Sequence, residues 1–100
     1  MDSNTARMIL LSIEIPEETL AAAEKVNKNI DWSPLVWSLD PIFTATGGSM
    51  GQMAFMHNQH PELNGMTPIE VLSCPDGIQL VQKAIQGFLR RDYEGKYGQR

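Results

Sequence analysis

The stretch TPIEVLSCPDGIQLVQKAIQGFLRRDY, residues 67–93, carries the strongest amphipathic pattern of the chain. Its apolar residues recur at steps of three and four, which is the spacing of one face of an α-helix. Asp76 stands at the capping position, so the pattern predicts a helix from there to about Tyr93, with a frayed end beyond Gly95. The residues that form the apolar face are Ile78, Val81, Ala84, Ile85, Phe88 and Leu89.

A short helix is predicted immediately before this one. Thr67-Pro68-Ile69-Glu70 has the composition of a capping box, with Thr67 as the N-cap, Pro68 first in the helix and Glu70 reaching back. Pro75 disfavours helical backbone at Cys74, so the short helix should end there. Asn64-Gly65, ahead of it, is a turn signal.

The clearest break in the chain is Thr46-Gly-Gly-Ser49. We place a boundary there, between a unit at residues 1–45 and a helical unit at residues 46–100, the latter starting with a helix over residues 50–59. Upstream of the break, an apolar stripe is interrupted by Pro41, which predicts one kinked helix or two short ones.

The amino-terminal segment has the pattern of a strand. Leu11, Ile13 and Ile15 alternate with polar residues, which predicts a strand with one buried face. Pro16 ends it, and a helix should follow to about Lys28. Because the chain offers no second convincing strand, we expect this one to pair with its copy in a homodimer. The predicted fold is therefore mainly α, with an N-terminal β-strand followed by a helical bundle.

Charge and composition narrow the function. The chain has 100 residues, 8 of them Lys or Arg against 12 Asp or Glu, for a net charge of −4. All of that excess lies in the first forty residues, so DNA binding without a partner is not expected. The longest apolar run, residues 8–11, is far short of a membrane span. With no signal peptide pattern and a single cysteine, we expect a cytoplasmic protein that does not bind membranes.

Few residues suggest chemistry. His57 and His60 are three apart, as two metal ligands on a helix can be, but no third strong ligand is placed near them, so a pair of surface histidines is expected. Cys74 lies among apolar neighbours and is expected to be a buried structural thiol. Gly47-Gly48 is followed by no Gly-Lys-Ser/Thr and is interpreted as a linker. We predict no enzyme activity, no cofactor and no metal site.

Residues 55–95, FMHNQHPELNGMTPIEVLSCPDGIQLVQKAIQGFLRRDYEG, resemble the toxin-binding domain of the MbcA/ParS/Xre family of antitoxins. The resemblance extends to about residues 46–96 if the methionine-rich helix is included. That family has a helix, then an N-P-x-L-x-G-x-[ST]-P turn leading into a short helix, then a glycine and a hydrophobic helix carrying a valine. The matching positions here are Pro61, Leu63, Gly65, Thr67, Pro68, Ile69, Leu72, Gly77 and Val81.

The resemblance implies a non-enzymatic bacterial antitoxin of a type II toxin–antitoxin pair. Its cognate toxin would have the RES fold and degrade nicotinamide adenine dinucleotide, and the antitoxin would occupy the entrance to the toxin's active site. As partner-binding residues we predict Arg90, Arg91 and Tyr93 at the end of the last helix, with Leu63 and Pro68 in the turn, because Tyr and Arg are enriched at binding hot spots. The two arginines also suit the negative end of the helix dipole, which requires no partner.

A second, shorter resemblance leads to an alternative. ILLSIEIPEETLAAAEKVNK, residues 9–28, is similar to the opening of a ribbon–helix–helix protein, whose paired strands read the DNA major groove. Here the outward positions are Leu10, Ser12 and Glu14, and Glu14 would oppose DNA phosphates. A ribbon–helix–helix transcriptional regulator is thus one alternative, and a plain interaction or phage accessory protein is another. The helix-turn-helix that usually precedes the toxin-binding domain is not found in the first 45 residues.

Overall fold

The structure, a computed structural model, describes residues 1–91, and within them it is helical with no strand. The mainly-α part of the predicted fold is confirmed. In chain order the elements are α1 (Ser3–Ser12), α2 (Glu17–Val26), α3 (Ser33–Thr46), α4 (Ser49–His57), the 3₁₀ turn η1 (Pro61–Leu63), α5 (Pro68–Val71) and α6 (Gly77–Leu89). None of the helices in these 91 residues has the length and apolar character needed to cross a membrane.

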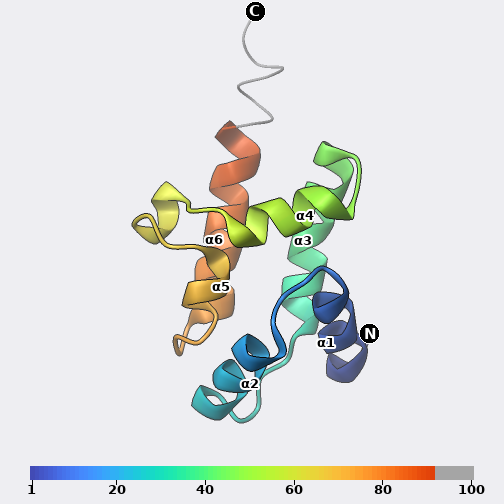
Figure 1. Ribbon diagram of the computed structural model, residues 1–100, viewed down its shortest axis with the longest axis vertical. Helices are drawn as coiled ribbons and strands as arrows, with labels where there is room; N and C mark the ends of the chain where they lie inside the picture. The colour runs from blue at the N-terminus through green and yellow to red at the C-terminus, as the bar shows by residue number, and fades with distance from the viewer. Residues whose placement is uncertain (92–100) are drawn as a thin grey trace, which may run out of the picture.

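Helix α3 is the centre of the arrangement. It packs against α1, α4 and α6, and Figure 1 shows α3 and α6 running alongside each other with α4 lying across them. The turn η1 and the short helix α5 pack on α6, while α1 and α2 lie at the end of the molecule away from the last turn of α6.

The buried apolar residues form one cluster, in which Trp32 and Phe55 are the largest side chains. Its members come from α1 through α6, so residues on both sides of Gly47 share this core. Burial of this apolar surface is the main force that stabilises the fold. The division into units at residues 45 and 46 stays a prediction.

The predicted amino-terminal strand is wrong. Residues 3–12 form helix α1 instead, with the Asp2 side chain accepting a hydrogen bond from the backbone N–H of Thr5 at 2.8 Å. Ala6 and Leu10, four residues apart, point into the core and are fully buried. A carboxylate N-cap followed by apolar residues on one helical face stabilises a helix at this position.

The three residues predicted to dimerise through this strand do not form a pairing edge. Leu11 lies in α1 and is half-buried, while Ile13 and Ile15 follow the helix and are buried in the chain's own core. Between them Glu14 has a positive φ of 67°, which turns the backbone. The strand that was predicted to pair with a second copy, and that the ribbon–helix–helix resemblance requires, is therefore not present in the structure.

A charged network joins the first three helices. The guanidinium of Arg7 donates to Glu17 at 2.8 Å and to Glu24 at 2.7 Å. The indole N–H of Trp32 donates to the same Glu24 carboxylate at 2.8 Å. Hydrogen bonds from Arg7, helped by the one from Trp32, hold the pKa of the Glu24 carboxyl below its usual value, although partial burial opposes the shift. The network thus fixes α1 and α2 against the start of α3.

Pro41 does not divide α3. The helix is continuous from Ser33 to Thr46, with Pro41 exposed on its surface. It ends at Gly47, whose φ of 84° is the left-handed conformation that favours glycine and whose N–H donates to the carbonyl of Phe43 at 2.9 Å. The predicted break at Thr46-Gly-Gly-Ser49 is thereby confirmed as the α3–α4 turn.

Candidate functional site

The segment from His60 to Thr67 forms a closed turn on the surface of α6. The backbone N–H of His60 donates to the carbonyl of Met66 at 3.2 Å, and that of Gly65 donates back to His60 at 3.1 Å. Asn64 and Gly65 both have positive φ, of 57° and 84°, so the turn signal in the sequence is confirmed. These residues bring the chain round into α5.

The capping box predicted at the start of α5 is present. The hydroxyl of Thr67 accepts from the N–H of Glu70 at 3.1 Å, and the Glu70 carboxylate accepts from the N–H of Thr67 at 2.8 Å. Pro68 follows as the first helical residue and is buried, as is Leu63 in the turn. The side chains of these two predicted partner-binding residues therefore face the chain's own core, and a partner would meet the exposed residues around them.

The expectation of two surface histidines is wrong for His60. This residue is 4% exposed, and its Nε2 lies 2.8 Å from the carbonyl oxygen of Phe55, to which it donates. Its ring lies 4.4 Å from that of Phe55 and 6.0 Å, edge-on, from that of Phe88. His60 is thus part of the core, while His57 is exposed, with Nε2 at 3.1 Å from the Glu14 carbonyl oxygen.

The remaining candidates for chemistry are the histidines and Cys74. No three His, Cys, Asp or Glu side chains come close enough to hold a metal ion anywhere in residues 1–91. Cys74 is half-buried rather than buried, at the corner between α5 and α6. Helix α5 ends at Val71, three residues before the predicted end at Cys74, and the chain turns over residues 72–76.

The end of α6 presents the two predicted arginines. Arg90 and Arg91 are exposed, and Arg91 pairs with Glu62 of the η1 turn. The second oxygen of Glu62, Oε1, is buried and has no hydrogen-bond partner among the described residues. Gly87 makes this approach possible, because a Cβ there would collide with the Glu62 carboxylate. The predicted contact Tyr93 lies outside the described residues.

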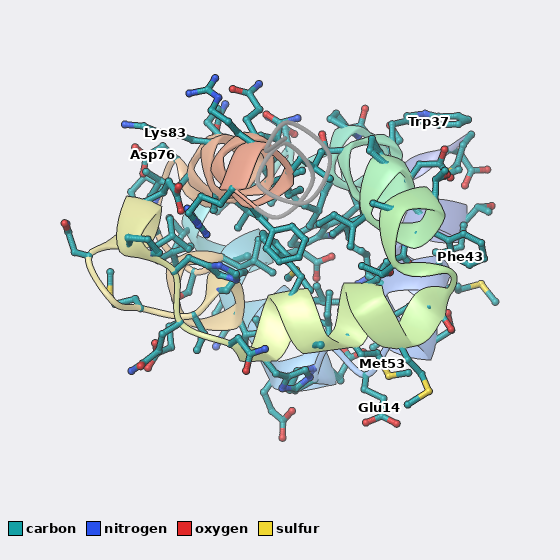
Figure 2. The ribbon with its side chains drawn as sticks, turned by 90° about the horizontal axis from the view of Figure 1, so that it is seen from above. Glu14, Trp37, Phe43, Met53, Asp76 and Lys83 are labelled. Carbon is teal, nitrogen blue, oxygen red and sulfur yellow. The ribbon has the colours of Figure 1, made fainter. Side chains whose placement is uncertain are left out.

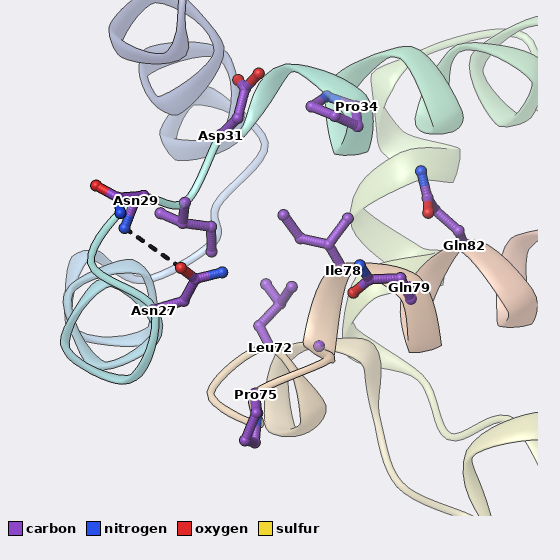
Figure 3. Close-up of a pocket in the computed structure, with 11 residues that line it drawn as sticks. Asn27, Asn29, Asp31, Pro34, Leu72, Pro75, Ile78, Gln79 and Gln82 are labelled. Atoms are coloured by element: carbon purple, nitrogen blue, oxygen red, sulfur yellow. Dashed lines mark hydrogen bonds between the residues drawn. The ribbon is translucent and has the colours of Figure 1, made fainter.

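A groove that the sequence did not predict lies between the α2–α3 loop and the first turns of α6 (Figure 3). Its volume is about 190 Å³, and Leu72 and Ile78 are among the apolar residues that line it. Part of its polar rim is occupied within the chain, since Asn27 accepts from the N–H of Asn29 at 3.3 Å and Gln82 donates to Ser38 at 2.9 Å. The groove is lined by Asn27, Asn29, Ile30, Asp31, Pro34, Leu72, Pro75, Gly77, Ile78, Gln79 and Gln82.

Comparisons with known protein families, curated proteins and solved structures gave no match to this chain. The resemblance of residues 55–95 to antitoxin toxin-binding domains therefore depends on the residues of that segment and on how they fold.

Proposed function

We propose that this chain is an antitoxin-like protein that binds and neutralises a partner toxin of the RES type. The partner would be encoded beside it in a type II toxin–antitoxin pair. In this proposal the chain performs no chemistry itself. It blocks access to the active site of an enzyme that degrades nicotinamide adenine dinucleotide.

The observation that carries the proposal is the role of Gly77. A Cβ at this position would lie 2.5 Å from the carbonyl oxygen of Val71 and 2.6 Å from that of Leu72. These are backbone atoms, so no side-chain rotation can relieve the contact, and only glycine lets α6 start against the end of α5. The glycine of the antitoxin pattern thus allows the close packing of α5 and α6 in this chain.

The other positions of the pattern belong to the same packing unit. Gly65 needs its left-handed φ of 84° to close the turn. Thr67 and Pro68 start α5, while Leu63 and Val81 are buried beneath it. The nine matching residues thus belong to one packing unit, a turn and a short helix on the face of α6, and this shared role supports the proposal.

The surface next to this unit suits protein binding. Arg91 is held by Glu62, so its guanidinium is partly ordered before any partner arrives, which lowers the entropic cost of binding. Arg90 is exposed beside it. Arginine is enriched among residues that dominate binding energy. We place the toxin contact at this end of α6.

The test is co-expression with the product of the neighbouring reading frame. Cells that express the toxin alone should lose nicotinamide adenine dinucleotide and stop growing, and the full chain should restore both. An Arg90→Ala/Arg91→Ala variant should protect at least roughly tenfold less well, the scale of hot-spot losses. Lys83→Ala, an exposed cation earlier on the same helix, is the matched control and should protect fully.

Thermal unfolding of the purified variants separates binding from stability. Lys83→Ala changes an exposed residue and should unfold at the temperature of the wild type. Arg90→Ala/Arg91→Ala also removes the partner of Glu62 and should unfold somewhat lower, while still folding in a single cooperative transition. Full protection by the double variant would place the interface elsewhere. Absence of protection by the wild type would overturn the proposed function and leave a plain interaction protein.

A further inference from the structure

Helix α3 has large apolar side chains on its exposed side as well as on its buried side. Leu35, Leu39 and Ile42 point into the core and are fully buried. On the other side, Trp37 is 62% exposed and Phe43 is 47% exposed, and Figure 2 shows both pointing away from α6. Exposed apolar side chains of this size, gathered on one face, mark a surface for contact with another molecule. We therefore expect the outer side of α3 to be covered by another protein surface.

This part of the chain is also nearly free of charge. Asp40 is the only Asp, Glu, Lys or Arg between Asp31 and Glu62. On α3 it lies between Trp37 and Phe43, three residues from each. Met50, in the first turn of α4 just beyond the α3–α4 turn, is 79% exposed and adds to the apolar character of this corner.

We propose that the outer face of α3, which we define as Trp37, Asp40, Pro41, Phe43 and Thr44, is the interface of a homodimer. In a two-fold dimer each copy presents the same surface, so like charges face each other across the axis. A chain with a net charge of −4 meets its copy with least repulsion through the surface that carries fewest charges. That argument favours a second copy over a charged partner.

An antiparallel crossing of the two α3 helices makes this face complementary to itself. With the two-fold axis near Asp40, Trp37 of one copy lies opposite Phe43 of the other. Aromatic pairs of this kind stabilise interfaces beyond the area they bury. The same axis brings the two Asp40 carboxylates together, and their repulsion weakens the dimer.

The exposed area sets the expected affinity. A fully buried aromatic side chain covers about 150–250 Å², so the exposed parts of Trp37 and Phe43 amount to roughly 200 Å². A standard interface covers about 800 Å² on each partner, so Met50 and the backbone around it must contribute. We expect a weak dimer with a Kd on the order of tens of micromolar. This inference does not depend on the proposed function, because α3 lies outside residues 55–95.

Sedimentation equilibrium of the full chain tests the dimer. Between roughly 1 and 500 μM, a range that brackets a weak interface, the wild type should pass from monomer to dimer. Trp37→Ser should raise the Kd at least about tenfold, as expected for loss of a central aromatic residue. The matched control is Val26→Ser, which removes a 49% exposed apolar side chain from α2 and should leave the Kd unchanged.

Asp40→Asn tests the arrangement of the two copies. Because it removes the repulsion at the axis while keeping the shape of the side chain, it should lower the Kd several-fold. A wild type that is monomeric at the highest concentration overturns the proposal, as does an equal Kd for Trp37→Ser and Val26→Ser. An Asp40→Asn variant that dimerises no more tightly overturns the antiparallel crossing.

Tryptophan fluorescence gives a second readout that does not depend on mutation. Trp32 is 1% exposed and Trp37 is 62% exposed, so acrylamide should quench only Trp37 in the monomer. Quenching should fall as the protein concentration rises and Trp37 becomes covered. Quenching that stays constant over the same range contradicts burial of Trp37 in a dimer.

Discussion

Substitution of Gly77 by alanine adds only one methyl group, but it should destabilise the protein strongly. Gly77 is buried at the start of α6, where a Cβ would lie 2.5 Å from the carbonyl oxygen of Val71 and 2.6 Å from that of Leu72. Both atoms belong to the backbone at the end of α5. The substitution must therefore move α5 and α6 apart or distort the turn that joins them.

The size of the effect follows from two opposing contributions. Overpacking of a tight interior contact costs about 1–3 kcal/mol. Alanine is a better helix former than glycine by up to about 1 kcal/mol, but the gain is smaller in the first turn. We expect a net loss of about 2 kcal/mol in the free energy of unfolding, which in a chain of 100 residues lowers Tm by roughly 8–16 °C.

Urea unfolding of the wild type and of Gly77→Ala measures this difference directly. If the free energy of unfolding falls with urea concentration at the same slope in both proteins, the folded state is retained. Gln79→Ala is the matched control. Gln79 is exposed two residues further along the same helix, so shortening its side chain creates no steric clash. That variant should lose less than about 1 kcal/mol. A Gly77→Ala protein as stable as the wild type would refute the packing argument at this corner.

Three further predictions concern local interactions. Thr67→Ala removes one side of the capping box and should cost about 1 kcal/mol in urea unfolding, whereas an unchanged stability would mean that α5 does not depend on its cap. His60→Ala should cost about 3 kcal/mol in the same assay, because it leaves a cavity beside Phe55 and removes one of the two hydrogen bonds to the Phe55 carbonyl. A loss below about 1 kcal/mol would contradict its role in the core. The third prediction concerns pH. The hydrogen bond from Arg7 holds the pKa of the Glu24 carboxyl below its ordinary value of 4.5. The stability that this interaction contributes is therefore complete above pH 4.5, and it is lost as the pH falls through the lower pKa of the folded state. Glu24→Gln should unfold with a weaker dependence on pH between about 5 and 3, and a dependence equal to the wild type's would exclude the contribution.

The carboxyl-terminal part of the fold could be predicted because its signals are local. The capping box at Thr67 needs only residues within one turn, and the turn at Asn64-Gly65 needs only a backbone preference. The face of α6 repeats over three turns, so its period is unambiguous. Each of these elements is stabilised by interactions between residues that are close together in the sequence.

The amino-terminal strand was predicted wrongly because two patterns overlap there. Leu11, Ile13 and Ile15 alternate like a strand, whereas Ala6 and Leu10 are spaced as on a helix. The helix forms because its apolar face finds a partner in α3, whereas a lone strand would have left its backbone groups unpaired. Asp2 as N-cap was the signal in the sequence that favoured the helix.

The candidate site required tertiary structure. Glu62 and Arg91 are 29 residues apart, and nothing local indicates that they pair. Gly87, a glycine within the strongest helical pattern of the chain, was the available signal, since a conformationally costly residue there indicates close approach of another group. Burial of His60 followed from the closed turn that places it against Phe55, which the spacing of two histidines could not reveal.

The most direct test of the proposed function is a titration. The purified full chain is added to the product of the neighbouring reading frame, which the proposal expects to be a RES-type toxin, and the rate at which nicotinamide adenine dinucleotide is consumed is measured. A neutralising partner should abolish consumption near equimolar ratio, with the Arg90→Ala/Arg91→Ala variant needing at least about tenfold more protein. Consumption that continues unchanged in an excess of the wild-type chain, or a neighbouring frame that encodes no such toxin, would contradict the account.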